Sequence, residues 1–301
     1  MRVKLLKENE AGVKIIRSQI DPVEMYVHTD ENNIKYSTVY FHYPEGDMLI
    51  ACCSSQIGCV ESCKFCATGS LPFIGNLSQD KMYGQYISSL NALDDIQRNR
   101  RPSNLLILLE GMGEASYNFD NAFNGMKKAI PELLSEYKTL RMRISTAGNL
   151  GLIDKLEKVV ENNVHAITYE FQLSLHSSID EDRKYLIPGF AKRWGVESTT
   201  KEFTSFAHRI GQKPRFNYLL LNFDKKNNYS ARHLEELVRL VESGSSLKLT
   251  KYSETGKNMS SPNDETYEEV GQFLQSHGIQ VHQRSLLGSD ILAACGMLNY
   301  E

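Results

Sequence analysis

Short apolar runs alternate with longer segments in which apolar residues recur every three or four positions, from residue 48 to residue 284. The short runs predict buried strands and the longer segments predict amphipathic helices. Strands are expected at residues 48–54, 105–111, 141–146, 167–175, 215–221, 246–252 and 279–284. Helices are expected at residues 78–93, 121–137, 151–163, 201–210, 231–243 and 264–278, with Ser78 as an N-cap. Repeated strand–helix units predict a mostly parallel sheet with helices outside it.

The number of units decides between parallel architectures. The chain has too few strand–helix units for a closed eight-stranded barrel with long loops, so an α/β fold with a partial barrel is expected. Active-site residues should follow the carboxyl ends of its strands. Residues 23–43 alternate β-formers around an Asp-Glu-Asn-Asn turn. We therefore divide the chain into a short N-terminal β extension at 1–46, a barrel at 47–284 and a C-terminal loop at 285–301.

Composition sets the cellular context. The chain has 301 residues, 41% hydrophobic and 24% charged, as in ordinary soluble globular proteins. The N-terminus lacks the apolar core of a secretory signal, and no apolar run is long enough to cross a membrane. A cytoplasmic location without membrane contact is expected. Structural disulfides are rare there, so clustered cysteines indicate a metal site or catalysis.

The charge balance bears on nucleic-acid binding. A formal net charge of −3 is not that of a protein held to nucleic acid by bulk electrostatics. This balance still allows a local basic patch. Arg98, Arg100 and Arg101 form a short basic run, which we interpret as a solvated helix end.

Five of the six cysteines lie within residues 51–69, two at the end of the first predicted barrel strand and three on the loop directly after it. Three of them, Cys59, Cys63 and Cys66, are spaced C-x3-C-x2-C, and soft thiolates favour zinc or an iron–sulfur cluster. A structural zinc site needs a fourth ligand, which His42 or His176 could supply only through long-range folding. Three ligands with one open position favour a [4Fe–4S] cluster that leaves one iron free for another molecule.

Further motifs extend this pattern. Phe65 precedes the third cysteine, giving the C-x3-C-x-Φ-C pattern that resembles the radical S-adenosylmethionine (SAM) superfamily. The ordered segments are SSQIGCVESCKFCATG at 54–69, GMGE at 111–114, ISTAG at 144–148, SLH at 174–176 and DILAACGML at 290–298. Together they resemble the RlmN/Cfr family of radical SAM methyltransferases, which methylate adenine carbons in ribosomal RNA and, for RlmN, in some tRNAs. The resemblance covers about residues 36 to 298.

The resemblance implies roles for two cysteines outside the cluster motif. Cys295 matches the cysteine that accepts a methyl group from one SAM, forming a methyl-cysteine intermediate. A second SAM, cleaved at the cluster, yields a 5′-deoxyadenosyl radical that abstracts hydrogen from this methyl group. Cys52, seven residues before Cys59, matches the cysteine that releases the product as a disulfide bond forms. Cys53 should point to the other face of the strand, and we expect it to be a buried structural residue.

The resemblance also implies SAM contacts and partners. It implies an RNA or nucleotide-like substrate and a flavodoxin-type electron donor. Arg183 and Pro188 match structural positions. The implied SAM-binding residues are Gly113, Glu114, Ser145, Ser174, Leu175, His176 and Ser253, the last replacing an asparagine of the family.

The chain also departs from the family pattern. Ala115 replaces a proline and Ala147 a serine, and Ser37 replaces a glutamate thought to remove the ring proton. A serine is not an unassisted base near neutral pH. The helical N-terminal RNA-binding module is expected to be missing, since only about 45 residues precede the cluster strand.

Three functions therefore stand. The first is methylation of adenine in RNA. The second is the same chemistry on a small heterocycle, nucleotide or peptide. The third is a non-catalytic iron–sulfur protein or sensor, against which the pair Cys52 and Cys295 argues.

Overall fold

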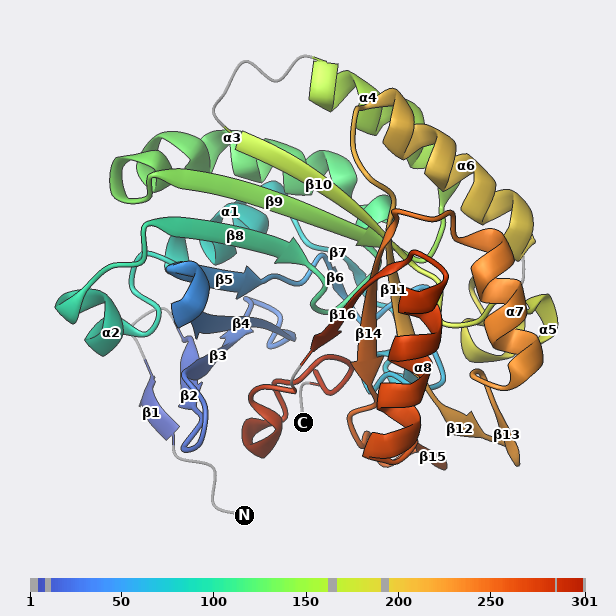
Figure 1. Ribbon diagram of the computed structural model, residues 1–301. Coiled ribbons are helices and arrows are strands. Elements are labelled where there is room, and N and C mark those ends of the chain that lie inside the picture. Colours follow the sequence, from blue (N-terminus) through green and yellow to red (C-terminus); the bar gives the residue numbers. More distant parts are fainter. Residues whose placement is uncertain (1–4, 9–11, 162–166, 191–194, 285, 300–301) are drawn as a thin grey trace.

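The computed structural model describes residues 5–8, 12–161, 167–190, 195–284 and 286–299. Seven parallel strands form a curved sheet with helices on its outer side (Figure 1). Each of these strands pairs in parallel with the next one in the series. They are β5 (Met48–Cys52), β8 (Asn104–Leu109), β9 (Thr139–Thr146), β10 (Ile167–Ser174), β11 (Arg215–Leu220), β14 (Ser246–Lys251) and β16 (Gln280–Arg284). The predicted α/β fold with a partial barrel is confirmed.

An antiparallel meander extends the same sheet beyond β5. Its strands are β1 (Leu5–Glu8), β2 (Lys14–Arg17), β3 (Val23–Thr29) and β4 (Lys35–Tyr43). The meander pairs with the barrel through β4 and β5, which run antiparallel. The whole sheet has 11 strands among the described residues. The N-terminal extension is therefore continuous with the barrel wall.

One main helix fills each crossover between parallel strands. These helices are α1 (Gln79–Ser88), α3 (Phe119–Glu136), α4 (Ile153–Glu161), α6 (Val196–Arg209), α7 (Ala231–Leu240) and α8 (Asp264–Ser276). Ser78 caps α1 as predicted, since its Oγ accepts a hydrogen bond from the Lys81 amide at 3.3 Å. Apolar residues of the outer sheet face, such as Met142, form the main core with these helices.

Several short elements were not predicted. The helix expected at 78–93 ends at Ser88. Within the rest of that range, Leu93 takes a left-handed conformation and donates its amide to the Glu24 carboxylate at 2.7 Å. This contact with β3 is long-range, so the local pattern does not contain it. The unpredicted elements are α2 (Asp94–Asn99), α5 (Asp180–Leu186), β6 (Gln56–Ile57), β7 (Gly75–Asn76), β12 (Asn222–Phe223), β13 (Lys226–Asn227) and β15 (Met259–Ser260).

The close approach of α1 and α3 gives a test of the packing. A Cβ atom at Gly125 would lie 2.9 Å from the Gln79 carbonyl oxygen, whereas one at Gly84 would meet nothing within 4 Å. Gly125→Leu should lower the free energy of unfolding by about 2 kcal/mol through overpacking. Gly84→Leu should raise it by about 0.5–1 kcal/mol, because glycine is a poor helix former. Urea denaturation measures both, and equal effects would contradict the packing described here.

Candidate active site

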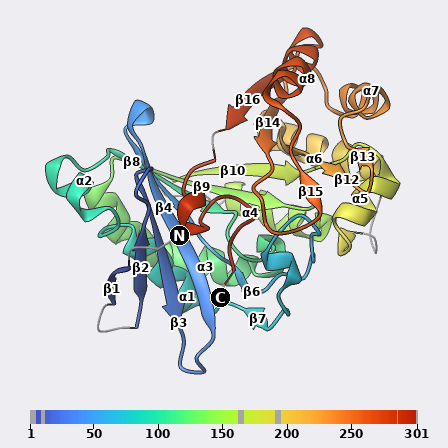
Figure 2. The same ribbon diagram turned by 90° about the horizontal axis from the view of Figure 1, so that it is seen from below.

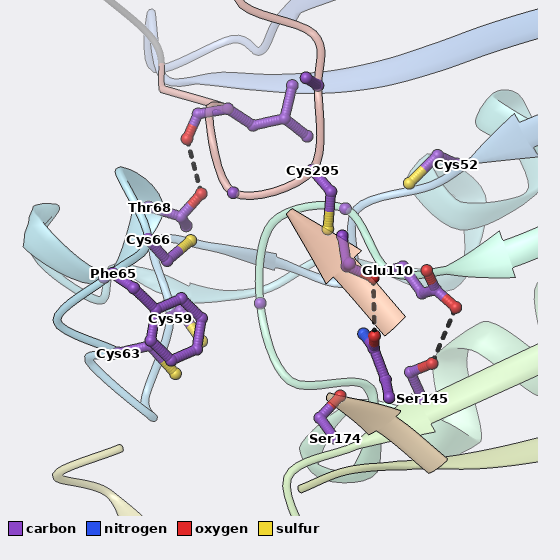
Figure 3. A pocket seen from close by; sticks show the side chains of 18 of the residues that line it. Cys52, Cys59, Cys63, Phe65, Cys66, Thr68, Glu110, Ser145, Ser174 and Cys295 are labelled. Atoms are coloured by element: carbon purple, nitrogen blue, oxygen red, sulfur yellow. Dashed lines mark hydrogen bonds between the residues drawn. The ribbon is translucent and has the colours of Figure 1, made fainter. Parts of the chain in front are cut away.

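The carboxyl ends of the parallel strands open onto one pocket (Figure 3). Its walls come from the cysteine loop after β5, the turns after β8, β9 and β10, and the C-terminal segment. Most of the site residues predicted from the sequence line it. These are Cys52, Cys59, Cys63, Cys66, Gly113, Glu114, Ser145, Ser174, His176 and Cys295. Leu175 and Ser253 are buried and are not among the residues that line the pocket.

The cysteine loop is held in shape by its own backbone. The Cys66 amide donates to the Cys63 carbonyl at 3.2 Å, and the Gly69 amide donates to the Cys66 carbonyl at 3.1 Å. A Cβ atom at Gly69 would lie 2.2 Å from the Cys63 carbonyl oxygen, so the loop needs glycine at this position. The close turn brings three thiols from one loop to one pocket.

The three thiols of this loop are largely buried. Burial raises the pKa of Cys59 to about 12 and raises the pKa values of Cys63 and Cys66. Uncharged at neutral pH, these thiols must release protons when they bind a metal. Within the described residues, no set of three His, Cys, Asp or Glu side chains converges closely enough to hold one metal ion. A polynuclear iron–sulfur cluster needs thiolates spread around it, which fits three thiols lining a shared pocket.

Glu114 joins two of the turns that line the pocket. Its Oε1 accepts from the Ser116 amide at 3.1 Å, and its Oε2 accepts from the Ala147 amide at 2.8 Å. The preceding Gly113 has a φ of +98°, and a Cβ atom there would lie 2.5 Å from Gln56. The GMGE turn after β8 is therefore fixed to the turn after β9 by a carboxylate.

His176 enters the pocket as a neutral imidazole. Its Nδ1 accepts from the Leu219 amide at 3.1 Å, which leaves the proton on Nε2. Burial, with Arg183 and Lys248 nearby, lowers its pKa to about 3. The ring packs edge-to-face on Phe65, with centroids 5.1 Å apart. His176 therefore connects the turn after β10 with the cysteine loop.

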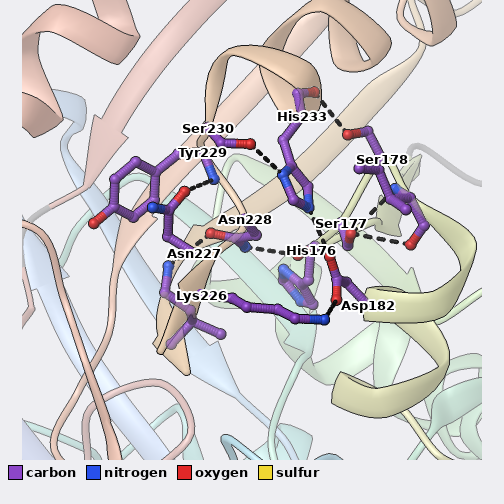
Figure 4. A network of polar contacts seen from close by, with 12 residues as sticks. His176, Ser177, Ser178, Asp182, Lys226, Asn227, Asn228, Tyr229, Ser230 and His233 are labelled. Carbon is purple, nitrogen blue, oxygen red and sulfur yellow. Dashed lines mark hydrogen bonds and ion pairs between the residues drawn. The ribbon is translucent and has the colours of Figure 1, made fainter. Parts of the chain in front are cut away.

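A buried polar network supports the backbone at His176 (Figure 4). His176 has a φ of +55°, which is unusual for a residue other than glycine. The Asn228 side-chain amide donates to the carbonyls of His176 and Leu219 at 2.7 and 2.6 Å. Nearby, His233 bonds Asp182 at 3.0 Å. These contacts hold the turn after β10 in its strained conformation.

Arg183 ties together the ends of two barrel strands. Its Nη2 donates to the carbonyls of Ala147 and Ser174 at 2.8 and 2.9 Å, and its Nε donates to Leu175 at 2.7 Å. The fully buried guanidinium stacks 3.6 Å above the Phe190 ring. These contacts agree with the structural role expected for Arg183.

The sequence analysis missed a charged pair in the pocket floor. Lys248 Nζ lies 3.0 Å from Glu110 Oε2, and the Ser145 hydroxyl donates to Glu110 Oε1 at 2.9 Å. Only 13% of the lysine and 7% of the glutamate side chain is exposed. The pair spans the barrel interior from β8 to β14. Its signal in the sequence was Glu110 as the one charged residue of the apolar run at 105–111, and Lys248 between the apolar residues Leu247 and Leu249.

The C-terminal segment, red in Figure 2, carries Cys295 to the pocket (Figure 3). The Gly296 carbonyl accepts from the Ala67 amide at 2.7 Å, and the Leu298 carbonyl accepts from the Thr68 hydroxyl at 2.6 Å. Both partners belong to the cysteine loop. Cys295 itself is exposed, and Cys52 lines the same pocket from the end of β5. All six cysteines are free thiols.

Two neighbouring positions lie outside the pocket lining. Cys53 is fully buried in the main core, as predicted, and burial raises its pKa well above the usual value. Ser37 is also fully buried, and its backbone carbonyl accepts from the Ser54 hydroxyl at 2.5 Å. Carboxylates do line the pocket, at Glu61, Glu110 and Glu114.

Comparisons with known proteins now bear on this site. No protein-family model matches the chain. The dual-specificity RNA methyltransferase RlmN of Oleidesulfovibrio alaskensis is 30% identical over 251 residues, covering 82% of this chain and 67% of the relative. A probable RlmN of Koribacter versatilis is 31% identical over 260 residues, covering 85% and 70%.

A solved structure agrees with these relatives. The crystal structure of a radical SAM methyltransferase from Sphaerobacter thermophilus superposes with a TM-score of 0.81 and 26% identity. The match covers 95% of this chain and 80% of the other. The sequence comparison and the structural comparison thus both find methyltransferases of this kind. The chain belongs to the RlmN/Cfr family of radical SAM methyltransferases.

Proposed function

We propose that this protein methylates an aromatic carbon of adenine in RNA, with Cys295 as the methyl carrier. The observation that carries the proposal is that Cys52 and Cys295 line the same pocket as the three-cysteine loop. A protein that only binds a cluster has no need of two further thiols there. A reaction that carries carbon on sulfur needs one thiol to hold it and a second to release it.

The substrate class rests on relatives and charge. The relatives are named as RNA methyltransferases, which supports RNA, and family membership argues against a non-catalytic sensor. The net charge of −3 favours the alternative, the same chemistry on a small heterocycle, nucleotide or peptide. A flavodoxin-type electron donor is part of the proposal. No helix among the described residues has the length and apolar character needed to span a bilayer.

The residues that would hold the cofactors are those of the pocket. Cys59, Cys63 and Cys66 are the proposed ligands of a [4Fe–4S] cluster. Once bound, the cluster and SAM supply the methyl group and a 5′-deoxyadenosyl radical. The chain's own groups orient SAM, with Glu114 fixing two turns and His176 presenting an Nε2–H donor.

The other residues expected to bind SAM fall into two groups, those that line the pocket and those that do not. Ser145 and Ser174 present hydroxyls to the pocket, and Gly113 leaves the turn backbone uncovered. Leu175 and Ser253 are buried and do not line the pocket, so we assign them a supporting role rather than direct contact. Cys295 would accept the methyl group. The Cys52 thiolate would then attack the Cys295 sulfur, so that a Cys52–Cys295 disulfide forms as the bond from this sulfur to the transferred carbon breaks, and the released carbon takes up a proton.

Thiol accessibility is the first test. In metal-free protein at pH 7.5, iodoacetamide should modify Cys295 at least tenfold faster than Cys63, because burial blocks access and raises the pKa of Cys63. Mass spectrometry of the peptides measures the rates. Protein unfolded in urea is the control, in which the difference should vanish. Equal rates in the folded protein would contradict the described exposure.

Iron binding is the second test. Anaerobic reconstitution should give about four irons and four sulfides per chain, with the absorption of a [4Fe–4S] centre. Changing Cys59, Cys63 or Cys66 to alanine should remove it. Cys52→Ala and Cys295→Ala are matched controls that should keep it. Stoichiometric zinc without iron, in protein prepared without oxygen, would reject the cluster assignment.

The two further thiols give the third test. Cys295→Ala should yield no methylated product, because the carrier is absent. Cys52→Ala should accumulate a covalent protein–substrate adduct, because the exchange partner is absent. Mass spectrometry of protein incubated with SAM, reductant and adenine-containing RNA measures both outcomes. Normal turnover by Cys52→Ala would rule out the proposed mechanism.

A further inference from the structure

Beneath the pocket, the inner face of the barrel carries a cluster of arginines. Side chains alternate along strands, so residues two apart on β9 face the same side. Ser145 lines the pocket, and Arg143 and Arg141 therefore follow it down the inner face. Arg215 on β11 and Glu170 on β10 complete what we call the interior arginine cluster. Its members are Arg141, Arg143, Arg215 and Glu170.

One carboxylate holds two of these arginines. Glu170 Oε1 accepts from Arg141 Nη1 at 3.1 Å, and its Oε2 accepts from Arg143 Nη2 and Nε at 2.6 and 2.8 Å. The glutamate side chain is 7% exposed, whereas the two arginine side chains are 30% and 19% exposed. The carboxylate is thus more deeply buried than the side chains of the two arginines that it binds.

The third arginine is not neutralised in the same way. Arg215 Nε is buried and has no hydrogen-bond partner in the described part of the chain. Burial lowers the pKa of Arg215, and Arg143 and Arg141 also lower it, against the opposing effect of Glu170. Three guanidinium groups therefore share one carboxylate, which leaves cationic donors for a further anion.

The cluster continues into the pocket floor. Gln172, two residues beyond Glu170, donates to the Ser145 hydroxyl at 3.3 Å, and Ser145 in turn donates to Glu110. Two residues along a strand span about 7 Å, which is within the reach of one nucleotide. With the Lys248–Glu110 pair included, these interior groups comprise four cations and two carboxylates. These groups below the pocket therefore carry a net positive charge, although Glu61 and Glu114 line the pocket itself and the whole chain has a net charge of −3.

We propose that the interior arginine cluster binds a phosphate group of the substrate while the base occupies the pocket above. This rests on the proposed function, since it assumes a nucleotide-like substrate. Guanidinium groups bind phosphate oxygens in pairs of parallel hydrogen bonds, and Arg215 has an unused buried donor for this purpose. The phosphate belongs either to a free nucleotide or to an RNA phosphodiester, and both sources have the same oxyanion chemistry.

Binding without turnover tests this site. The full chain is titrated calorimetrically with adenosine, adenosine 5′-monophosphate and the dinucleotide ApA at low salt. The monophosphate or ApA should bind about tenfold or more tightly than adenosine, because charged hydrogen bonds are gained. Tighter binding of the monophosphate identifies a terminal phosphate, and tighter binding of ApA identifies a phosphodiester. Equal affinities of all three compounds would overturn the proposal.

Variants locate the effect. Arg215→Met should abolish the preference for phosphate while keeping the Glu170 ion pairs, and Glu170→Gln should strengthen phosphate binding. Arg239→Met removes an exposed arginine on α7 and is the matched control, which should behave like the parent protein. Thermal melting checks that each variant is folded. A folded Arg215→Met protein that keeps the full preference would reject the site.

Failure of this site and failure of the proposed function are distinguishable. Phosphate-dependent binding without any methylated product would reject the proposed reaction and keep the anion site. Methylated product with no phosphate preference in binding would reject the anion site and keep the proposed reaction.

Discussion

The alternation of side chains along the barrel strands is the constraint on which the site depends. On β9, Met142 packs beneath the helices while Arg143 faces the interior. At the end of β5, Cys52 lines the pocket while Cys53 is buried in the core. A shift of one residue in register would exchange these faces and place charged groups in the core, at a cost of several kcal/mol each. The chemistry of the pocket is therefore fixed by the same apolar burial that holds the helices on the sheet.

Buried polar groups then fix the turns that follow these strands. Glu114 joins the turns after β8 and β9, Arg183 joins the ends of β9 and β10, and Asn228 holds the turn at His176. Each group accepts or donates hydrogen bonds with backbone atoms rather than with solvent. Removing one partner would leave buried backbone groups unsatisfied, which costs about 1–3 kcal/mol per group. The loops that carry the functional residues are thus as firmly connected as the strands themselves.

The strand–helix pattern was enough to predict the barrel, because apolar burial in a parallel sheet is visible in local sequence. The cysteine spacing likewise predicted one loop, since all three residues are close in the chain. Leu175 and Ser253 were expected to bind SAM, and both are buried without lining the pocket, because motif matching does not indicate where a side chain points.

Long-range contacts were not predictable from the sequence. The Glu110–Lys248 pair joins residues 138 positions apart, and Leu93, before the unpredicted helix α2, is bound to Glu24 on β3. Each depends on how distant strands face one another, which no local pattern records. The interior arginines were not predicted for the same reason. Charged residues in a strand pattern are expected on the surface, and only the strand register shows that these face the interior.

Hydrogen bonds attach the C-terminal segment on both sides of Cys295, and they keep this exposed thiol at the pocket. On one side of Cys295, the Gly288 amide donates to Asp21 at 2.8 Å, and Asp290 accepts from Ser18 at 2.8 Å. On the other side, Gly296 bonds the cysteine loop. Between these anchors, Cys295 is exposed. In the proposed reaction this thiol would face SAM first and the substrate later, which a short span between fixed ends would allow. Breaking one anchoring hydrogen bond costs only about 1 kcal/mol, so such a movement of the span would leave the barrel strands undisturbed.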